Sequence, residues 1–125
     1  MIETRREQLL TELQLDNRYK LVKALRSGRY KQGKFALKQV DDEGNTSFCC
    51  LGVACDLLGR TEMFGRRLED AGVLDDDVME AYGFESPNAA YANKERCLAS
   101  DNDEGKSFEQ IADIIVSLSP GLVMD

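Results

Sequence analysis

The sequence predicts a compact α+β domain that is mostly helical and has one small antiparallel β-hairpin. Several segments place apolar residues at helical spacing beside capping residues, whereas one segment, 34–48, alternates charged and apolar residues before a turn. The chain has 125 residues, of which 42% are hydrophobic, and this is enough to bury one ordinary core. We therefore expect residues 1–125 to form a single domain.

Two helices are predicted at the start of the chain. Thr4 followed by Glu7 has the spacing of a capping box, and the polar pair at 16–17 is expected to end the first helix. The apolar stripe of this helix consists of Leu9, Leu10 and Leu13. The second helix is expected over residues 18–27, with Gly28 as its C-terminal cap. Its inward face consists of Leu21, Val22 and Leu25.

A β-hairpin and a central helix follow. Residues 34–38 alternate charged and apolar side chains as a half-buried strand does, residues 42–45 are typical of a turn, and Phe48 resumes an apolar run. Residues 50–58 are apolar almost all round, which indicates a short buried helix that ends at Gly59. We expect this helix to form the centre of the core.

The second half of the chain has a helix signal at three places. Acidic residues 75–77 precede an apolar stretch that is closed by Gly83, and they are typical of a helix N-terminus. The pair at 86–87, Ser-Pro, is a permissible helix start. Residues 101–105 are read as a polar loop. After it, the clearest amphipathic helix of the chain is predicted, starting at the capping-box pair Ser107 and Gln110 and ending before Pro120.

The charge distribution is the strongest functional signal. Residues 17–38 contain no Asp or Glu, although the net charge of the chain is −7. Residues 41–125 hold 19 of the 23 carboxylates and only six Lys or Arg. This asymmetry predicts that the N-terminal third meets an anion. The basic side chains of that segment are Arg18, Lys20, Lys23, Arg26, Arg29, Lys31, Lys34 and Lys38.

A glycine-flanked loop inside the basic segment is the preferred binding site. Residues 28–34 match the spacing of a phosphate-binding P-loop, but Phe35 stands where Ser or Thr would hold magnesium, and a helix is expected before the loop. We therefore reject a nucleoside triphosphatase. A solvated turn between helix and hairpin is the alternative to a binding loop. The predicted ligand-binding residues are Arg26, Arg29, Lys31 and Lys34 on phosphate and Tyr30 stacking on a base.

Several segments carry a resemblance to a known group of proteins. They are ALRSG (24–28), YKQGK (30–34), FCCLGV (48–53) and CDL (55–57), followed later by Asn102-Asp103 and GKSF (105–108). Together they resemble a group of small uncharacterised proteins encoded by tailed phages and prophages. The resemblance implies phage origin and brings no established chemistry with it.

The residue inventory excludes most of the common hydrolase mechanisms. The chain has no histidine, so Ser-His-Asp and Cys-His mechanisms lack their base. Cys49, Cys50 and Cys55 lie in an apolar run without a C-x-x-C pair, which favours free, buried thiols over a metal site or a nucleophile. No metal or cofactor is predicted. An enzyme that uses only other side chains remains an alternative, with Asp56, Asn102 and Asp103 as secondary candidate residues.

We therefore predict a small phage accessory protein, with a role in countering host defence or in host takeover, that binds without catalysis. Its ligand would be an anionic phosphorylated molecule, either a nucleotide signal or a short nucleic acid. The alternative is a protein inhibitor whose acidic face docks on a host enzyme that handles nucleic acid. A further alternative is a homo-oligomer in which the basic segment of one copy contacts the acidic remainder of another. It would use the same cations as the predicted ligand site.

The expected location is the cytoplasm of the host cell. No segment approaches the roughly 18 to 20 apolar residues of a membrane span. The N-terminus is charged and lacks the apolar run of a signal peptide, so neither export nor a membrane partner is expected.

Overall fold

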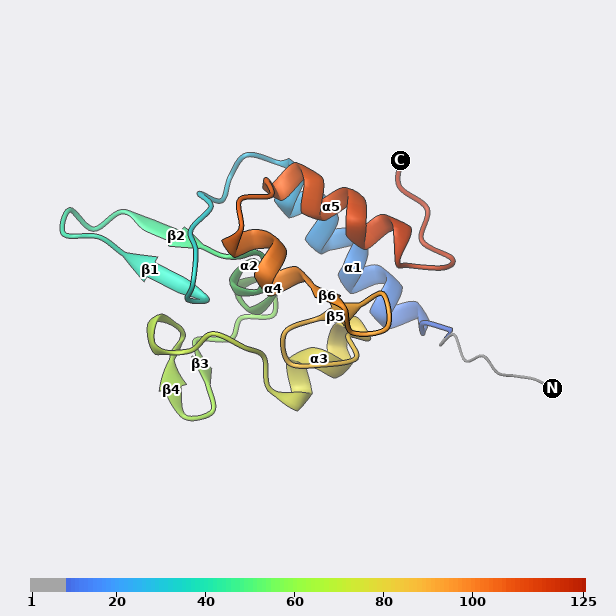
Figure 1. The fold of residues 1–125 in the computed structure, drawn as a ribbon, viewed down its shortest axis with the longest axis horizontal. Coiled ribbons are helices and arrows are strands. Elements are labelled where there is room, and N and C mark those ends of the chain that lie inside the picture. Colours follow the sequence, from blue (N-terminus) through green and yellow to red (C-terminus); the bar gives the residue numbers. More distant parts are fainter. Residues whose placement is uncertain (1–8) are drawn as a thin grey trace.

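The computed structural model describes residues 9–125, which Figure 1 shows coloured along the chain. The helices are α1 (Glu12–Arg26), α2 (Cys50–Leu57), the 3-10 helix η2 (Leu68–Asp70), α3 (Asp76–Tyr82), α4 (Leu98–Asp103) and α5 (Phe108–Ser117). The strands are β1 (Lys38–Val40), β2 (Thr46–Phe48), β3 (Glu62–Met63), β4 (Arg66–Arg67), β5 (Ala90–Tyr91) and β6 (Arg96–Cys97). These elements confirm the predicted α+β class.

The core lies where α1, α2 and α5 meet. Figure 1 shows α1 and α5 running side by side, with α2 and α4 beside one end of this pair and α3 below them. The predicted inward face of residues 18–27 is confirmed, because its three apolar side chains are buried. Residues 50–55 of α2 are also buried, as expected for the central helix. At Gly52 a Cβ atom would lie 1.7 Å from the carbonyl oxygen of Leu37, so only glycine allows this contact.

The division of the N-terminal segment into two helices is wrong. A single helix, α1, runs through the predicted boundary at Asp16 and Asn17 and begins at Thr11, which forms a capping box with Gln14. Polar residues do not stop this helix, because Asn17 Nδ2 donates to the carbonyl of Ala81 at 2.8 Å and thereby joins α1 to α3. The predicted cap at positions 4 and 7 lies outside the described residues.

The apolar stripe assigned to the first predicted helix is not a core face. The exposed fractions of Leu9 and Leu13 are 87% and 66%. At the other end of α1, the predicted stop is confirmed, since Ser27 is the C-cap and Gly28 follows with a φ of 80°.

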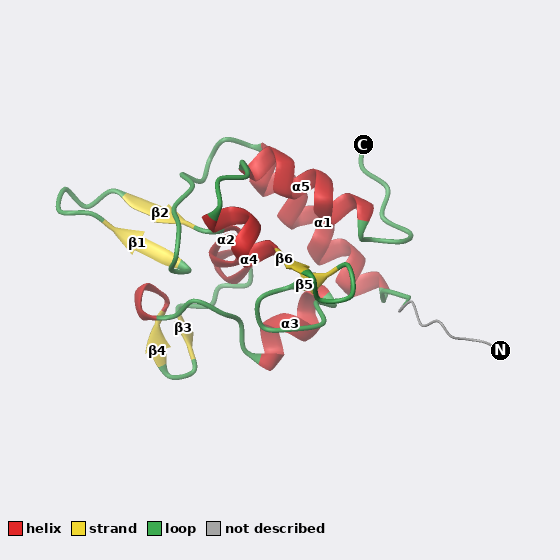
Figure 2. Cartoon of the chain, viewed as in Figure 1, coloured by secondary structure: helices red, strands yellow, loops and turns green. Residues whose placement is uncertain are grey.

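Three antiparallel hairpins flank the helices, as Figure 2 shows. In the first hairpin Lys38 pairs with Phe48 and Val40 with Thr46, around the predicted turn. Its first strand begins at Lys38 and not at residue 34, because the chain turns a corner at Phe35, where φ is 74°. The β3–β4 and β5–β6 hairpins were not predicted, since strands of two residues have too few positions to show alternation.

Two predictions for the second half of the chain are confirmed and two are wrong. Asp75 caps α3 and Gly83 closes it in a left-handed conformation, and α5 begins at the Ser107–Gln110 capping box. However, no helix starts at Ser86, whose hydroxyl oxygen accepts from the backbone N–H of Ala90 at 2.8 Å in a turn. Most of the segment 101–105 is also not a loop, because α4 continues to Asp103.

Within residues 9–125, every helix is too short or too polar to cross a lipid bilayer.

Candidate functional site

The segment between α1 and β1, residues 27–37, is held in one conformation by backbone hydrogen bonds. We call it the basic loop. The N–H of Gly33 donates to the carbonyl of Phe48 at 2.8 Å, and the N–H of Phe48 donates to the carbonyl of Lys31 at 2.9 Å. The N–H of Phe35 donates to Asp103 Oδ1 at 2.8 Å. The loop is therefore attached to β2 on one side and to α4 on the other.

Asn102 is the central support of the basic loop. Its side chain lies in α4 and is fully buried. Its Nδ2 donates to the carbonyl of Gly33 at 2.7 Å, and its Oδ1 accepts from Gln32 Nε2 at 2.9 Å and from the N–H of Cys50 at 3.2 Å. One amide thus joins the basic loop, α2 and α4.

Gln32 extends the same network to the start of α5. Its Nε2 also donates to the carbonyl of Lys106 at 2.8 Å, and its Oε1 accepts from the N–H of Phe108 at 3.1 Å. Both polar atoms of the Gln32 side chain are therefore engaged, and a shift of the loop would break contacts to α4 and to the start of α5.

The predicted phosphate-binding cations divide into two groups. Arg26 forms an ion pair with Asp113 across α1 and α5, with Nη2 and Oδ1 at 2.7 Å. Arg29, Lys31 and Lys34 are exposed and form no ion pair with any residue of 9–125. We call these three side chains the basic loop surface.

The rest of the basic segment contributes less charge than its sequence indicates. Lys20 pairs with Asp16 at 3.1 Å and Lys23 with Asp125 at 3.6 Å. Arg18 is buried in the protein and does not face solvent. Fewer than eight cations are therefore available to bind an anion, and the available ones lie mainly on the basic loop.

Tyr30 anchors the loop to α2, a role that sequence reasoning did not find. Its hydroxyl donates to Asp56 Oδ2 at 2.6 Å, and its ring packs edge-on against Phe48 with the centroids 5.3 Å apart. Burial and the hydrogen bond to Asp56 raise the pKa of Tyr30 to about 12. A nucleic-acid base would have to stack on the part of the Tyr30 ring that the contacts with Phe48 and Asp56 leave free.

The three secondary candidates, Asp56, Asn102 and Asp103, meet around the basic loop. Each accepts a hydrogen bond from it: from the Tyr30 hydroxyl, from the Gln32 side chain and from the Phe35 N–H. These bonds give all three residues a supporting role. The neighbouring Asp101 is buried and accepts from the Tyr91 hydroxyl, so within the predicted acidic segment 101–104 this carboxylate is not available for docking, whereas Glu104 is exposed.

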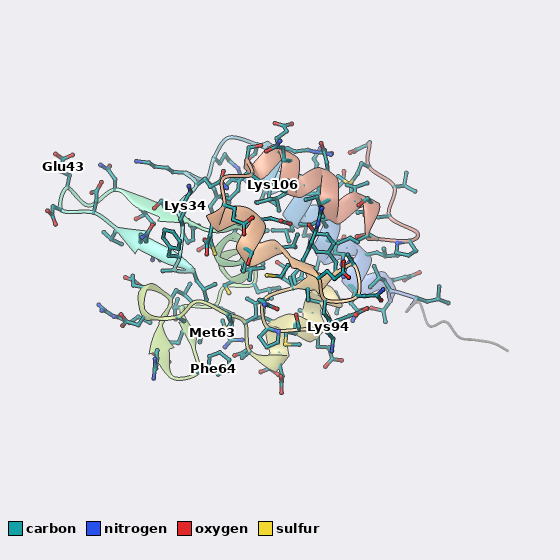
Figure 3. All side chains as sticks on the ribbon, viewed as in Figure 1. Lys34, Glu43, Met63, Phe64, Lys94 and Lys106 are labelled. Carbon is teal, nitrogen blue, oxygen red and sulfur yellow. The ribbon has the colours of Figure 1, made fainter. Side chains whose placement is uncertain are left out.

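Lys106 is a basic residue that sequence reasoning missed. It lies between α4 and α5, next to the basic loop, because its carbonyl binds Gln32. Figure 3 labels Lys106 and Lys34 on the same side of the molecule. A single lysine in an acidic region belongs to no sequence motif. Its position next to the basic loop is therefore seen only in the structure.

The cysteines have the character expected of structural thiols. Cys49, Cys50 and Cys55 are free and buried, and burial raises the pKa of Cys49 to about 11 and that of Cys55 to about 12. Their thiolates are thus disfavoured at neutral pH. Within the described part of the chain, no three Cys, Asp or Glu side chains are grouped as metal ligands.

Two cavities are lined by residues outside the basic loop. Their volumes are about 430 and 490 Å³, and both are lined partly by the β5–β6 hairpin. Neither has a lining residue from 26–34, so the basic loop surface is open and lies outside both cavities.

Comparisons with known proteins give one partial match. The family model described as Domain of unknown function (DUF8296) matches residues 14–67, which is less than half of the chain. The matched segment contains the basic loop with its supports Phe48 and Asp56, whereas Asn102 and Asp103 lie beyond it. No curated protein matches the chain, and neither does a solved structure.

Proposed function

We propose that this chain is a non-catalytic phage accessory protein that binds short single-stranded nucleic acid through the basic loop surface. The observation that carries the proposal is the combination of exposed, unpaired cations with a fixed backbone. Arg29, Lys31 and Lys34 form no ion pair within residues 9–125. Their neighbours in the chain, Gln32, Gly33 and Phe35, are hydrogen-bonded to β2 or α4. Cations on an ordered loop bind phosphates without first ordering the chain.

An extended ligand fits this surface better than a free mononucleotide. A mononucleotide is usually recognised in a concave pocket, whereas the basic loop lines neither of the two cavities. A strand with several phosphates can contact cations that are spread over an open surface. The resemblance to phage proteins supports a role in host interaction, by analogy alone.

The acidic-face inhibitor and the His-independent enzyme have less support. The inhibitor would dock through the carboxylates of 75–77 and 101–104, of which Asp101 is buried and Asp75 is paired with Arg60, so that fewer of them are free to dock. The enzyme would use Asp56, Asn102 or Asp103, which are all engaged in holding the basic loop.

The test is fluorescence anisotropy of a labelled single-stranded 12-mer over a series of salt concentrations. If three phosphates are neutralised, the plot of log K against log salt has a slope of about −2. Lys31→Glu and Lys34→Glu should each weaken binding strongly and make the slope shallower. Lys94→Glu is the matched control, because it has the same charge change on an exposed lysine outside the basic loop surface.

Two outcomes would contradict the proposal. One is the absence of binding at low salt, and the other is binding that Lys94→Glu weakens as much as Lys31→Glu does. Sedimentation of the free protein at low and high salt is measured alongside, because salt-sensitive self-association would assign the same cations to a homo-oligomer.

A further inference from the structure

The cavity of about 430 Å³ is distinct from the basic loop surface. It lies between α1, the segment that follows α3, the β5–β6 hairpin and the end of α5. Its volume is within the range of about 300–1,000 Å³ that is typical of small-molecule sites. Its lining is more polar than apolar, and the small or apolar side chains that contribute to it include Ala89, Ala90, Ala92, Leu98, Ile115 and Leu118.

A buried cation, Arg18, forms one wall of this cavity. Its exposed fraction is 5%. Its guanidinium donates to the carbonyls of Tyr82, Gly83 and Leu118, at 2.6, 2.8 and 3.2 Å, and to Ser119 Oγ at 2.8 Å. These acceptors are all neutral, and no carboxylate in residues 9–125 forms an ion pair with Arg18.

The buried guanidinium therefore has no ion-pair partner within residues 9–125 and has one unused donor. Its other contacts are with the Phe84 ring, whose centroid lies 5.1 Å from Cζ, and, through longer-range attraction, with the charge of Glu85. A guanidinium has five N–H groups, and only four of those of Arg18 have an acceptor among residues 9–125. Burial lowers the pKa of Arg18 to about 10, which is the expected effect on a cation removed from water. An anion in the cavity would restore the pairing.

The loop at the rim of the cavity is held in an unfavourable conformation. Ala92, Asn93 and Lys94 have φ values of 55°, 58° and 71°, in the left-handed region that residues with a Cβ rarely adopt in succession. Backbone strain of this kind is concentrated at ligand sites. Lys94, which Figure 3 labels, is exposed and lines the cavity from the turn that joins β5 to β6, so this turn brings a second cation to the rim.

We propose that this cavity binds a small molecule that carries one carboxylate on an apolar body. The carboxylate would accept from the unused N–H of Arg18 and from Lys94, while the body would contact Ala89, Ile115 and Leu118. Glu85 also lines the cavity, and its negative charge repels a doubly charged phosphate monoester more strongly than a singly charged carboxylate.

The test uses three probes with the same aromatic body: 1-naphthaleneacetate, its neutral primary amide and 1-naphthyl phosphate. Each is titrated into the ¹⁵N-labelled protein, and amide chemical shifts give both the affinity and the location. The carboxylate is expected to bind at least about tenfold more tightly than the amide, because charge-assisted hydrogen bonds are the stronger ones. Shifts should be concentrated in residues 83–94 and 115–118.

Variants separate this site from the basic loop surface. Lys94→Glu should weaken carboxylate binding about threefold or more, while Lys31→Glu, with the same charge change, should leave it unchanged. Leu118→Trp should abolish binding by filling the cavity. Because Leu118→Trp alters α5, the Lys94→Glu result stands independently of it.

The proposal is overturned by equal affinity for carboxylate and amide, by tighter binding of the phosphate, by shifts centred on the basic loop, or by no localised shift at millimolar probe. None of these outcomes contradicts nucleic-acid binding, since that proposal depends on Lys31 and Lys34 and is tested separately by anisotropy.

Discussion

Replacement of Asn102 by alanine should destabilise the whole fold and not only the basic loop. The change removes three hydrogen bonds and leaves the N–H of Cys50 and the carbonyl of Gly33 without their partner. An unsatisfied buried polar group costs about 1–3 kcal/mol. Because Cys50 is fully buried and Gly33 only partly, we expect a loss of about 3 kcal/mol in the free energy of unfolding.

Urea unfolding measures this loss directly. With an m-value of about 2 kcal/mol/M, the midpoint should fall by about 1.5 M for Asn102→Ala. Asn45→Ala is the matched control: the same change in an exposed turn, where the expected loss is below about 1 kcal/mol. A double mutant with Gln32→Ala should be less destabilised than the sum of the two single variants, by about 1 kcal/mol. A loss below about 1 kcal/mol for Asn102→Ala, or strict additivity with Gln32→Ala, would refute the reasoning.

Two further predictions concern packing and pH. Gly52→Ala should destabilise the protein by about 3 kcal/mol or more in thermal unfolding, because its Cβ would meet the backbone of Leu37, whereas Gly72→Ala, with no atom nearer than 3.6 Å, should be nearly neutral. The pKa of Tyr30 is raised in the folded state, so the stability that this group contributes is complete below pH 10 and is lost as pH rises toward about 12. Tyr30→Phe should therefore make unfolding less pH-dependent in this window, and an unchanged profile would contradict the Tyr30–Asp56 contact.

The sequence predicts those elements whose signals are local. α3 and α5 each begin at a residue whose side chain caps the first turn, and both are found where the capping pattern places them. α4 has no such signal, because its N-cap is Cys97 and its polar residues, such as Asn102, are typical of a loop. Asn102 is satisfied inside the protein by Gln32, which is 70 residues away along the chain. No pattern within a window of ten residues can indicate such a partner.

The basic segment can be recognised from the sequence, whereas the roles of its individual residues depend on packing. Net charge identifies residues 17–38 as basic, yet ion pairs such as Arg26–Asp113 depend on helix packing and are not visible in composition. In the same way, Tyr30 has the sequence context of a stacking residue, while its position beside Asp56 makes it a support. The Arg18 cavity was missed because Arg18 is one cation among eight in the sequence, and only burial distinguishes it.

Helix α4 connects the two proposed sites through adjacent residues. Asn102 holds the basic loop, and Asp101, one position earlier, accepts from the hydroxyl of Tyr91, which lines the Arg18 cavity. Both side chains are buried in a helix of six residues, so their burial depends on the loop on one side and on the β5–β6 hairpin on the other. A polar segment of this kind is stable in the core only when both neighbours are in place. The acidic sequence around residue 101, which resembles a solvated loop, is thus the structural link that orders both candidate binding surfaces.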